Sequence, residues 1–86
     1  MWYVYLLSSK KTDQWYLGST KDLRKRISKH NLGKNKSTKY GVPWEIIYCE
    51  ININKFDARA REKYLKSGMG RKYLKHRLKL FFAFGF

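Results

Sequence analysis

Apolar and aromatic residues gather in three short runs, which the hydrophobic pattern predicts to be β-strands. The runs "WYVYLLS", "WYLG" and "WEIIYCEI" cover residues 2–8, 15–18 and 44–51 and are rich in aromatic and β-branched types. The polar segment "SKKTDQ" separates the first two runs, so we expect them to form an antiparallel hairpin. Gly18 ends the second strand of this hairpin.

The residues after the hairpin change to a helical pattern. The segment "STKD" is typical of a helix N-terminus, and Leu23 and Ile27, four residues apart, predict the core face of an amphipathic helix. We expect this helix to reach about Asn31, with Gly33 as its C-terminal stop. Residues 32–43 are polar and basic and contain the only proline, which predicts a loop.

The C-terminal part predicts two more helices. Asn54 indicates the start of a helix over residues 55–67 that ends at Gly68, and a third helix opens near Gly70 and runs through "RKYLKHRLKL". The predicted order is β-β-α-β-α-α, an α+β fold in which helices flank a three-stranded antiparallel sheet. A chain of this length is expected to form one domain, residues 1–86.

Charge gives the first indication of a partner. Twenty Lys and Arg against six Asp and Glu give a net charge of +14, spread along the chain. Such a field favours a polyanion, most often nucleic acid; the alternative is a small protein that is simply basic. The single Cys49 excludes an internal disulfide and favours a reducing, cytoplasmic setting. The sequence has neither the pattern of a signal peptide nor the ~18 consecutive apolar residues of a membrane span.

Two pairs of polar residues are candidates for chemistry. Tyr5 and Tyr16 are expected to lie opposite or diagonal to each other on the hairpin; the alternative is an aromatic pair that only fills the core. Arg26 and His30, at i and i+4 on the first helix, have the spacing to clamp one phosphate; the alternative is a solvated basic helix.

Glu62 is a third candidate because it falls within an apolar stripe of the second helix. The stripe consists of Ala58, Glu62, Leu65 and Met69. An acid in this stripe is directed toward the sheet, where a carboxylate needs a partner or a metal. The alternative is a rim residue paired with Lys66, four residues further on. The sequence pattern alone therefore predicts a basic domain with a candidate acid–tyrosine–arginine site.

These segments, taken in order, resemble the GIY-YIG nuclease family. "YVY" at 3–5 and "YLG" at 16–18 look like its two signature tripeptides, and "DLRKRISKHN" carries Arg26 and His30 of its helix motif. The resemblance continues in "TKYGVPWEIIY" and "ARAREKYLKSGMGRKYLK" and covers residues 2 to about 78. It is to the small stand-alone bacterial members, which are related to the nuclease domains of excision-repair and homing enzymes.

The resemblance implies a phosphodiesterase that acts on DNA with one divalent cation, Mg²⁺ or Mn²⁺, held by Glu62. Tyr5 would assist deprotonation of the attacking water, with the surrounding Lys and Arg lowering its pKa. Tyr16 would position the scissile phosphate or the water. Arg26 would neutralise charge on the pentacovalent phosphate, and His30 would hydrogen-bond near the leaving or attacking oxygen.

The implied partner is DNA, branched or damaged DNA included, in a DNA-repair setting. Further candidates for nucleic-acid contact are Lys21, Lys25, Lys39 and Tyr40. One alternative is a binding module that kept the fold and lost cleavage, since residues 71–80 lack the asparagine of several active members. Another is an RNA-associated protein whose aromatic residues stack bases. We expect the tail "FFAFGF" to pack back onto the core, with an exposed partner site as the alternative.

Overall fold

The computed structural model describes residues 1–84, which form a three-stranded sheet and four helices in the order β-β-α-β-α-α-α. The strands are β1 (Trp2–Ser9), β2 (Trp15–Thr20) and β3 (Trp44–Asn52). The helices are α1 (Leu23–Asn31), α2 (Lys55–Lys66), α3 (Gly68–Arg77) and α4 (Lys79–Phe84), with a 3-10 turn over Lys39–Gly41. All strand pairs are antiparallel in the order β2-β1-β3, which confirms the predicted α+β class. No helix in this part of the chain is long and apolar enough to cross a membrane.

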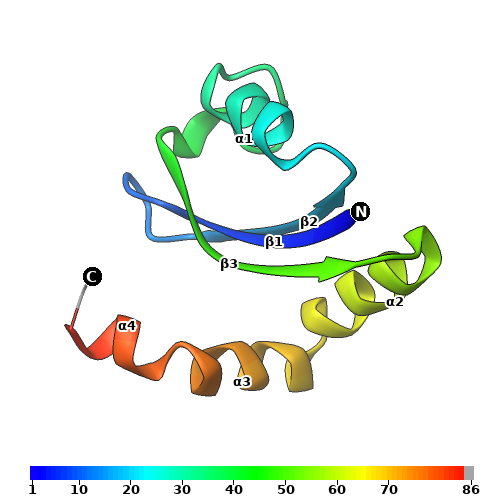
Figure 1. Cartoon of the computed structure of the whole chain (residues 1–86). Helices are drawn as coiled ribbons and strands as arrows, with labels where there is room; N and C mark the ends of the chain where they lie inside the picture. Colours follow the sequence, from blue (N-terminus) through cyan, green and yellow to red (C-terminus); the bar gives the residue numbers. More distant parts are fainter. Residues whose placement is uncertain (85–86) are drawn as a thin grey trace.

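The central strand, β1, is buried on both faces. Figure 1 shows α1 on one side of the sheet and α2 and α3 on the other. Val4 and Leu6 pack toward α2 and α3, whereas Tyr5 and Leu7 pack toward α1. A strand covered on both sides has no solvated face, which explains the unbroken apolar run near the N-terminus. Cys49 of β3, opposite Tyr5 in the register, is partly buried.

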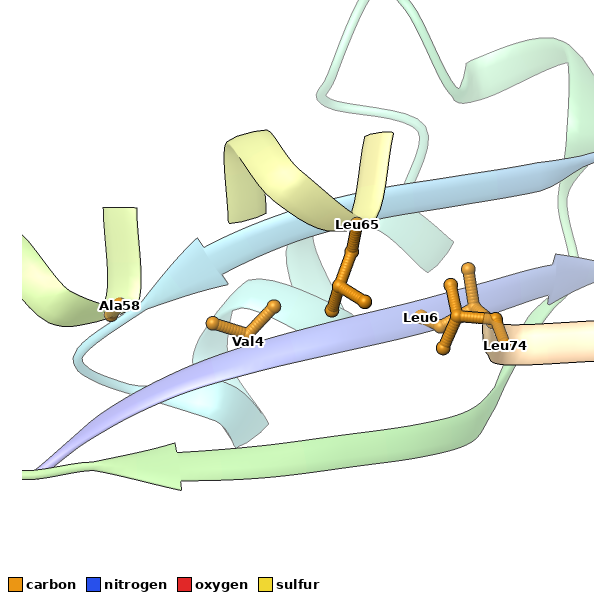
Figure 2. Packing of buried hydrophobic residues seen from close by; sticks show 5 residues of the cluster. All are labelled: Val4, Leu6, Ala58, Leu65 and Leu74. Carbon is orange, nitrogen blue, oxygen red and sulfur yellow. The ribbon is translucent and has the colours of Figure 1, made fainter. Parts of the chain in front are cut away.

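One apolar cluster lies between the sheet and the pair α2 and α3. Its buried members, shown in Figure 2, are Val4, Leu6, Ala58, Leu65 and Leu74. Ala58 and Leu65 confirm the predicted stripe on α2, but Met69 is 72% exposed and does not belong to it. The stripe stops because α2 ends at Lys66 and Ser67 has an extended backbone, so Met69 already belongs to α3.

Helix α1 begins and ends where its sequence predicts, but the predicted end of the second strand at Gly18 is wrong, because β2 continues to Thr20. The Asp22 side chain caps it by accepting a hydrogen bond from the backbone N–H of Lys25 at 3.0 Å. Leu23 and Ile27 pack against the cluster that contains Tyr5. Gly33 has a φ of +72°, the left-handed conformation that favours glycine after a helix. The predicted core face and C-terminal stop are therefore confirmed.

The junction between α2 and α3 places a glycine where a side chain has no room. The Ser67 hydroxyl oxygen accepts a hydrogen bond from the Gly70 N–H at 3.1 Å and so caps α3. A Cβ on Gly70 would overlap the backbone of Tyr64 and Leu65, whereas one on Gly68 would meet nothing within 4 Å. The predicted stop at Gly68 is therefore wrong: α2 ends before Ser67, and Gly68 opens α3.

The third predicted helix is divided in two. At Leu78 the backbone leaves the helical conformation, with φ −105° and ψ 19°, and its side chain packs on the core cluster. The chain then continues as α4, and the Phe82 ring stacks on Trp15 with centroids 5.4 Å apart. The expected packing of the tail onto the core is met only in part: Phe82 stacks on Trp15 but is itself 44% exposed, and no residue of α4 is buried. Residues 85–86 of the tail lie outside the described part.

A bidentate ion pair fixes α2 to β3. The Arg61 side chain donates from Nε and Nη2 to the two carboxylate oxygens of Glu50, at 2.8 and 2.9 Å. Its guanidinium also lies over the rings of Tyr64 and Tyr73, 5.3 and 4.9 Å from their centroids. The hydrogen bonds from Arg61 hold the pKa of the Glu50 carboxyl below its ordinary value. This pair, partly shielded from water, orients α2 on the sheet.

Candidate functional site at the edge strand

Strand β2 forms one edge of the sheet, and its successive side chains face opposite helices. Tyr16 packs in the cluster under α1, while Ser19 donates a hydrogen bond to Glu62 of α2. Side chains alternate along a strand, so groups from α1 and α2 meet around this one edge. The candidates on the α1 side are Tyr5, Tyr16, Arg26 and His30; Glu62 lies on the α2 side.

Three aromatic rings meet on the α1 side of the sheet. In the β1–β2 register Tyr5 is opposite Gly18 and Tyr16 is opposite Leu7, so the two tyrosines are diagonal and share a face, as predicted. Their ring centroids are 6.4 Å apart. The imidazole of His30 lies 4.8 Å from the Tyr16 ring and 6.0 Å from the Tyr5 ring. The hairpin and α1 therefore converge on one buried aromatic cluster.

Both nitrogens of His30 are engaged within the protein. Its Nε2 is hydrogen-bonded to the Tyr5 hydroxyl at 3.1 Å, and its Nδ1 to the Thr38 hydroxyl at 2.8 Å. All three residues have an exposed fraction of 0%. His30 was expected to hydrogen-bond near the leaving or attacking oxygen; in this structure it reaches the site through Tyr5. Thr38 lies in the predicted loop, at the start of the segment "TKYGVPWEIIY", but no sequence pattern assigned it a role.

Burial, more than charge, sets the acidity of these groups. Burial and the neighbouring Tyr16 raise the pKa of Tyr5 to about 12, against a smaller lowering by the Arg26 guanidinium beside it. The nearby cation does lower the pKa, but desolvation outweighs it, so the expected net lowering of the Tyr5 pKa is wrong. Burial, with the charges of Arg26 and Lys29, lowers the pKa of His30. At neutral pH Tyr5 is a phenol and His30 a neutral imidazole.

Gly18 leaves the space that the Tyr5 hydroxyl occupies. A Cβ at Gly18 would lie 2.6 Å from the Tyr5 hydroxyl oxygen and 3.2 Å from Cε1 of Tyr16. Both neighbours are aromatic rings inside a packed cluster and cannot rotate away freely. The glycine of the second tripeptide is thus explained by the close approach of a tyrosine from the first.

Gly18→Ala is expected to destabilise the fold by about 2 kcal/mol, because the added methyl group forces a buried ring to shift. For a domain of this size, the melting temperature should fall by roughly 10 °C. Thermal and urea unfolding measure both quantities. Unchanged stability would contradict the close contact between Gly18 and Tyr5.

Arg26 lines a strongly basic cleft beside these rings. The cleft has a volume of about 340 Å³ and lies between the start of α1, the end of β2 and α2. Its cationic residues are Lys21, Lys25, Arg26, Lys29 and Arg59, and Trp2, Ser19, Thr20 and the acidic Asp22 complete the wall. Lys21 and Lys25 were predicted as nucleic-acid contacts. Arg59 was not predicted as a site residue. The feature of the sequence that could have indicated it is its position one helical turn before Glu62.

Lys39 and Tyr40 lie in another part of the molecule, on the short 3-10 turn. The Tyr40 hydroxyl donates a hydrogen bond to the Gln14 side chain at 2.7 Å. Neither residue lines the basic cleft. The structure therefore brings Lys21 and Lys25 next to Arg26 but does not bring Lys39 and Tyr40 there.

The Glu62 side chain points toward the sheet and is also paired with Lys66. The structure therefore combines the two arrangements that the sequence left open, a sheet-facing acid and a partner of Lys66. One carboxylate oxygen accepts from the Ser19 hydroxyl at 2.5 Å and the other from Lys66 Nζ at 2.8 Å. Partial burial works to raise the Glu62 pKa, but the hydrogen bonds from Lys66 and Ser19 and the charge of Arg59 outweigh it. The pKa lies below its ordinary value, and Glu62 is ionised at neutral pH.

The donor set around Glu62 fits a cation that is bound mainly through water and phosphate oxygens. Among the described residues, no three or more His, Cys, Asp and Glu side chains lie together so that they could hold a metal ion. A lone ionised carboxylate suits Mg²⁺, which keeps several waters and completes its shell with substrate phosphates. The Lys66 side chain that pairs with this carboxylate is 55% exposed to solvent. Glu62 is therefore the residue that would hold such an ion.

Comparison with known proteins identifies the family to which the chain belongs. Residues 1–77 match the GIY-YIG catalytic domain, and the chain belongs to the GIY-YIG family. It is 44% identical over 57 residues to the UPF0213 protein YazA of Bacillus subtilis, covering 65% of this chain and 58% of that protein. The match thus spans less than two thirds of that relative.

Two further relatives have the same family designation. The chain is 42% identical over 65 residues to a UPF0213 protein of Clostridium perfringens, covering 74% of this chain and 69% of the relative. It is 38% identical over 74 residues to a UPF0213 protein of Staphylococcus saprophyticus, covering 85% of this chain and 89% of that relative. No solved structure matches the chain.

Proposed function

We propose that this protein is a divalent-metal-dependent DNA endonuclease that hydrolyses phosphodiester bonds at the edge of β2. The observation that carries the proposal is the convergence there of a Tyr5–His30 pair, Arg26 in a basic cleft and the ionised carboxylate of Glu62. The match to the GIY-YIG catalytic domain supports this reaction class. Phosphate hydrolysis needs a proton acceptor for water and cations for the developing charge, and these groups supply both.

Each residue has a role that follows from its exposure. Arg26 is partly exposed in the cleft, so it contacts the phosphate with its planar guanidinium. Tyr16 is also partly exposed and orients the phosphate or the attacking water. Tyr5 is fully buried in the free protein and lies beside the Arg26 guanidinium, so it meets the attacking water only in the complex with DNA.

Tyr5 accepts a proton from the attacking water only if its own proton moves on. With a pKa of about 12 it is a phenol at neutral pH, and its hydroxyl is bonded to His30. His30 Nε2 takes the phenolic proton while the Tyr5 oxygen takes the proton from water, which leaves hydroxide to attack phosphorus. Glu62 would hold Mg²⁺ or Mn²⁺, which when bound neutralises charge on the phosphate oxygens.

The direct test is nicking of supercoiled plasmid with Mg²⁺ or Mn²⁺ and with EDTA. We expect cleavage with the metals and none with EDTA. A panel of branched, flapped, nicked and linear DNA then defines the preferred DNA structure. Absence of cleavage with every metal and DNA in the panel would contradict the proposal.

A second candidate is a catalytically weak or inactive nucleic-acid-binding module of the same fold. It is favoured by the internal pairing of the candidate groups: Tyr5 and His30 bond to each other, and Glu62 is neutralised by Lys66. For this module DNA binding persists, falls steeply as salt rises because of the +14 charge, and does not depend on metal.

Arg26→Lys is expected to lower the turnover number about 100-fold while DNA affinity changes little, because a lysine keeps the charge but loses the two-pronged contact. Single-turnover cleavage and equilibrium binding are measured side by side. The matched control is Lys25→Arg, an exposed neighbour in the same cleft, which should leave both quantities near wild type. Equal losses of binding and turnover in Arg26→Lys would make Arg26 an ordinary phosphate contact.

A further inference from the structure

The hydrogen-bonded line from Tyr5 through His30 ends on Thr38, a residue to which no sequence pattern assigned a role. Its hydroxyl lies 2.8 Å from His30 Nδ1, on the far side of the ring from Tyr5. Thr38 has an exposed fraction of 0%, so water does not replace it as a partner of the ring. The tautomer of His30 therefore depends on how Thr38 uses its single hydroxyl hydrogen.

The favoured tautomer of His30 is the one in which every hydrogen-bonding hydrogen of the three residues has an acceptor. Tyr5, neutral His30 and Thr38 each contribute one hydrogen to this line. With the hydrogen on Nδ1, Tyr5 donates to Nε2, Nδ1 donates to Thr38, and the Thr38 hydroxyl donates to the Asn35 carbonyl, 3.5 Å away. All three hydrogens then have an acceptor.

With the hydrogen on Nε2, one hydrogen-bond donor among these three residues has no acceptor. The ring would donate to Tyr5 and accept from Thr38, and the buried Tyr5 hydroxyl hydrogen would have no acceptor among residues 1–84. A buried donor without a partner is costly. The Arg26 guanidinium beside the Tyr5 oxygen acts in the same direction, because a cation favours the oxygen lone pairs facing it and the hydrogen turned away.

We propose that Thr38 is a positioning residue that holds His30 in the Nδ1–H tautomer, so that Nε2 faces Tyr5 as a proton acceptor. The consequence for catalysis rests on the proposed nuclease function. Because Thr38 keeps the hydrogen on Nδ1, Nε2 of His30 stays unprotonated and can accept the Tyr5 proton. The imidazolium formed by this transfer keeps its Nδ1–H bond to Thr38, so no group has to rotate during the step.

Thr38 is itself held by contacts that do not use its hydroxyl. Its carbonyl accepts a hydrogen bond from Trp44 Nε1 at 2.7 Å, and its backbone N–H donates to the Asn35 carbonyl at 3.1 Å. Trp44 is 4% exposed and packs in the same cluster as Tyr5. The hydroxyl can therefore be removed by substitution while the backbone around it stays in place.

The tautomer is measured directly by long-range ¹H–¹⁵N correlation NMR of the histidine rings, with wild type, Thr38→Val and Thr38→Ser. His76, the only other histidine, is identified with a His76→Gln variant. We expect the Nδ1–H pattern for His30 in wild type, a shift toward Nε2–H in Thr38→Val, and its return in Thr38→Ser. An Nε2–H pattern in wild type would overturn the proposal, and this holds even if the valine variant fails to fold.

Activity then tests the consequence. Thr38→Val should lower the turnover number about 10-fold or more with little change in KM, and Thr38→Ser should restore it. An unchanged turnover number in a folded Thr38→Val variant would overturn the positioning role. If wild type shows the Nδ1–H pattern but cleaves no DNA, the tautomer assignment stands and the nuclease function fails, so the two failures are distinguishable.

Discussion

Glu62→Gln is expected to abolish DNA cleavage while DNA binding stays equal or becomes tighter. Glutamine keeps the size of the side chain and its carbonyl can still accept from Ser19, but the charge that would hold a divalent cation is lost. A cation that neutralises phosphate charge contributes several kcal/mol to the transition state, so cleavage should fall by at least about 100-fold. Binding improves or is unchanged because one negative charge near the phosphate is removed.

A matched control for Glu62→Gln is Glu45→Gln. Glu45 also forms an ion pair, with Lys10 at 3.5 Å, but it lies on β3 and is 43% exposed. The control should cleave at the wild-type rate. A Glu62→Gln variant that still cuts DNA like wild type would refute the metal role and leave Glu62 as a structural partner of Lys66.

The same variant has a small, pH-dependent effect on stability. The pKa of Glu62 is lowered in the fold, so its ion pair stabilises the native state above the unfolded pKa and is lost as pH falls through the folded pKa. Because Lys66 is 55% exposed, the contribution is at most about 1 kcal/mol at neutral pH. Urea unfolding should show this difference at pH 7 and none well below pH 4.5, the ordinary value for the carboxyl.

Gly70→Ala is expected to have the largest effect on folding, a loss of about 3 kcal/mol or more in the free energy of unfolding. The new Cβ would overlap the backbone of Tyr64 and Leu65, and a backbone cannot turn aside as a side chain can. To relieve the overlap, α3 has to move away from α2, which withdraws Leu74 from the core cluster. Chemical denaturation followed by circular dichroism measures the loss.

Gly68→Ala is the matched control for Gly70→Ala, because both glycines lie in the first turn of α3. A Cβ at Gly68 meets nothing within 4 Å, and alanine favours a helix more than glycine does. Gly68→Ala should therefore be neutral or stabilising by up to about 1 kcal/mol. Equal losses in the two variants would mean that helix α3, not its close approach to α2, requires the glycines.

Local sequence patterns predicted the strands, the first helix and the tyrosine pair of the candidate site. The strands, the start and stop of α1 and the diagonal placement of Tyr5 and Tyr16 depend on side-chain alternation, capping and turn chemistry within short stretches. The boundaries near Gly68 and Leu78 were not predicted, because they depend on where α3 and α4 pack, through Leu74 and through the stacking of Phe82 on Trp15.

The acidity of the site residues could not be read from composition. A basic sequence suggested a lowered pKa for Tyr5, but burial raises it to about 12 because desolvation outweighs the one cation beside the ring. The pairing of Glu62 with Lys66 follows from helical spacing, whereas its bond to Ser19 joins residues 43 positions apart. Thr38 opens the segment "TKYGVPWEIIY" of the family resemblance, but no pattern gave it a role, since that role depends on the ring that it contacts.

The sequence by itself determined which segments become strands and helices, the overall charge and the resemblance to the GIY-YIG family, because these depend on residue type and on spacing along the chain. The tertiary structure alone decided that Gly18 and Gly70 are points of close contact and that Tyr5 is a buried phenol bonded to His30. Those properties are set by desolvation and by atoms brought together from distant segments, and neither acts on a chain before it folds.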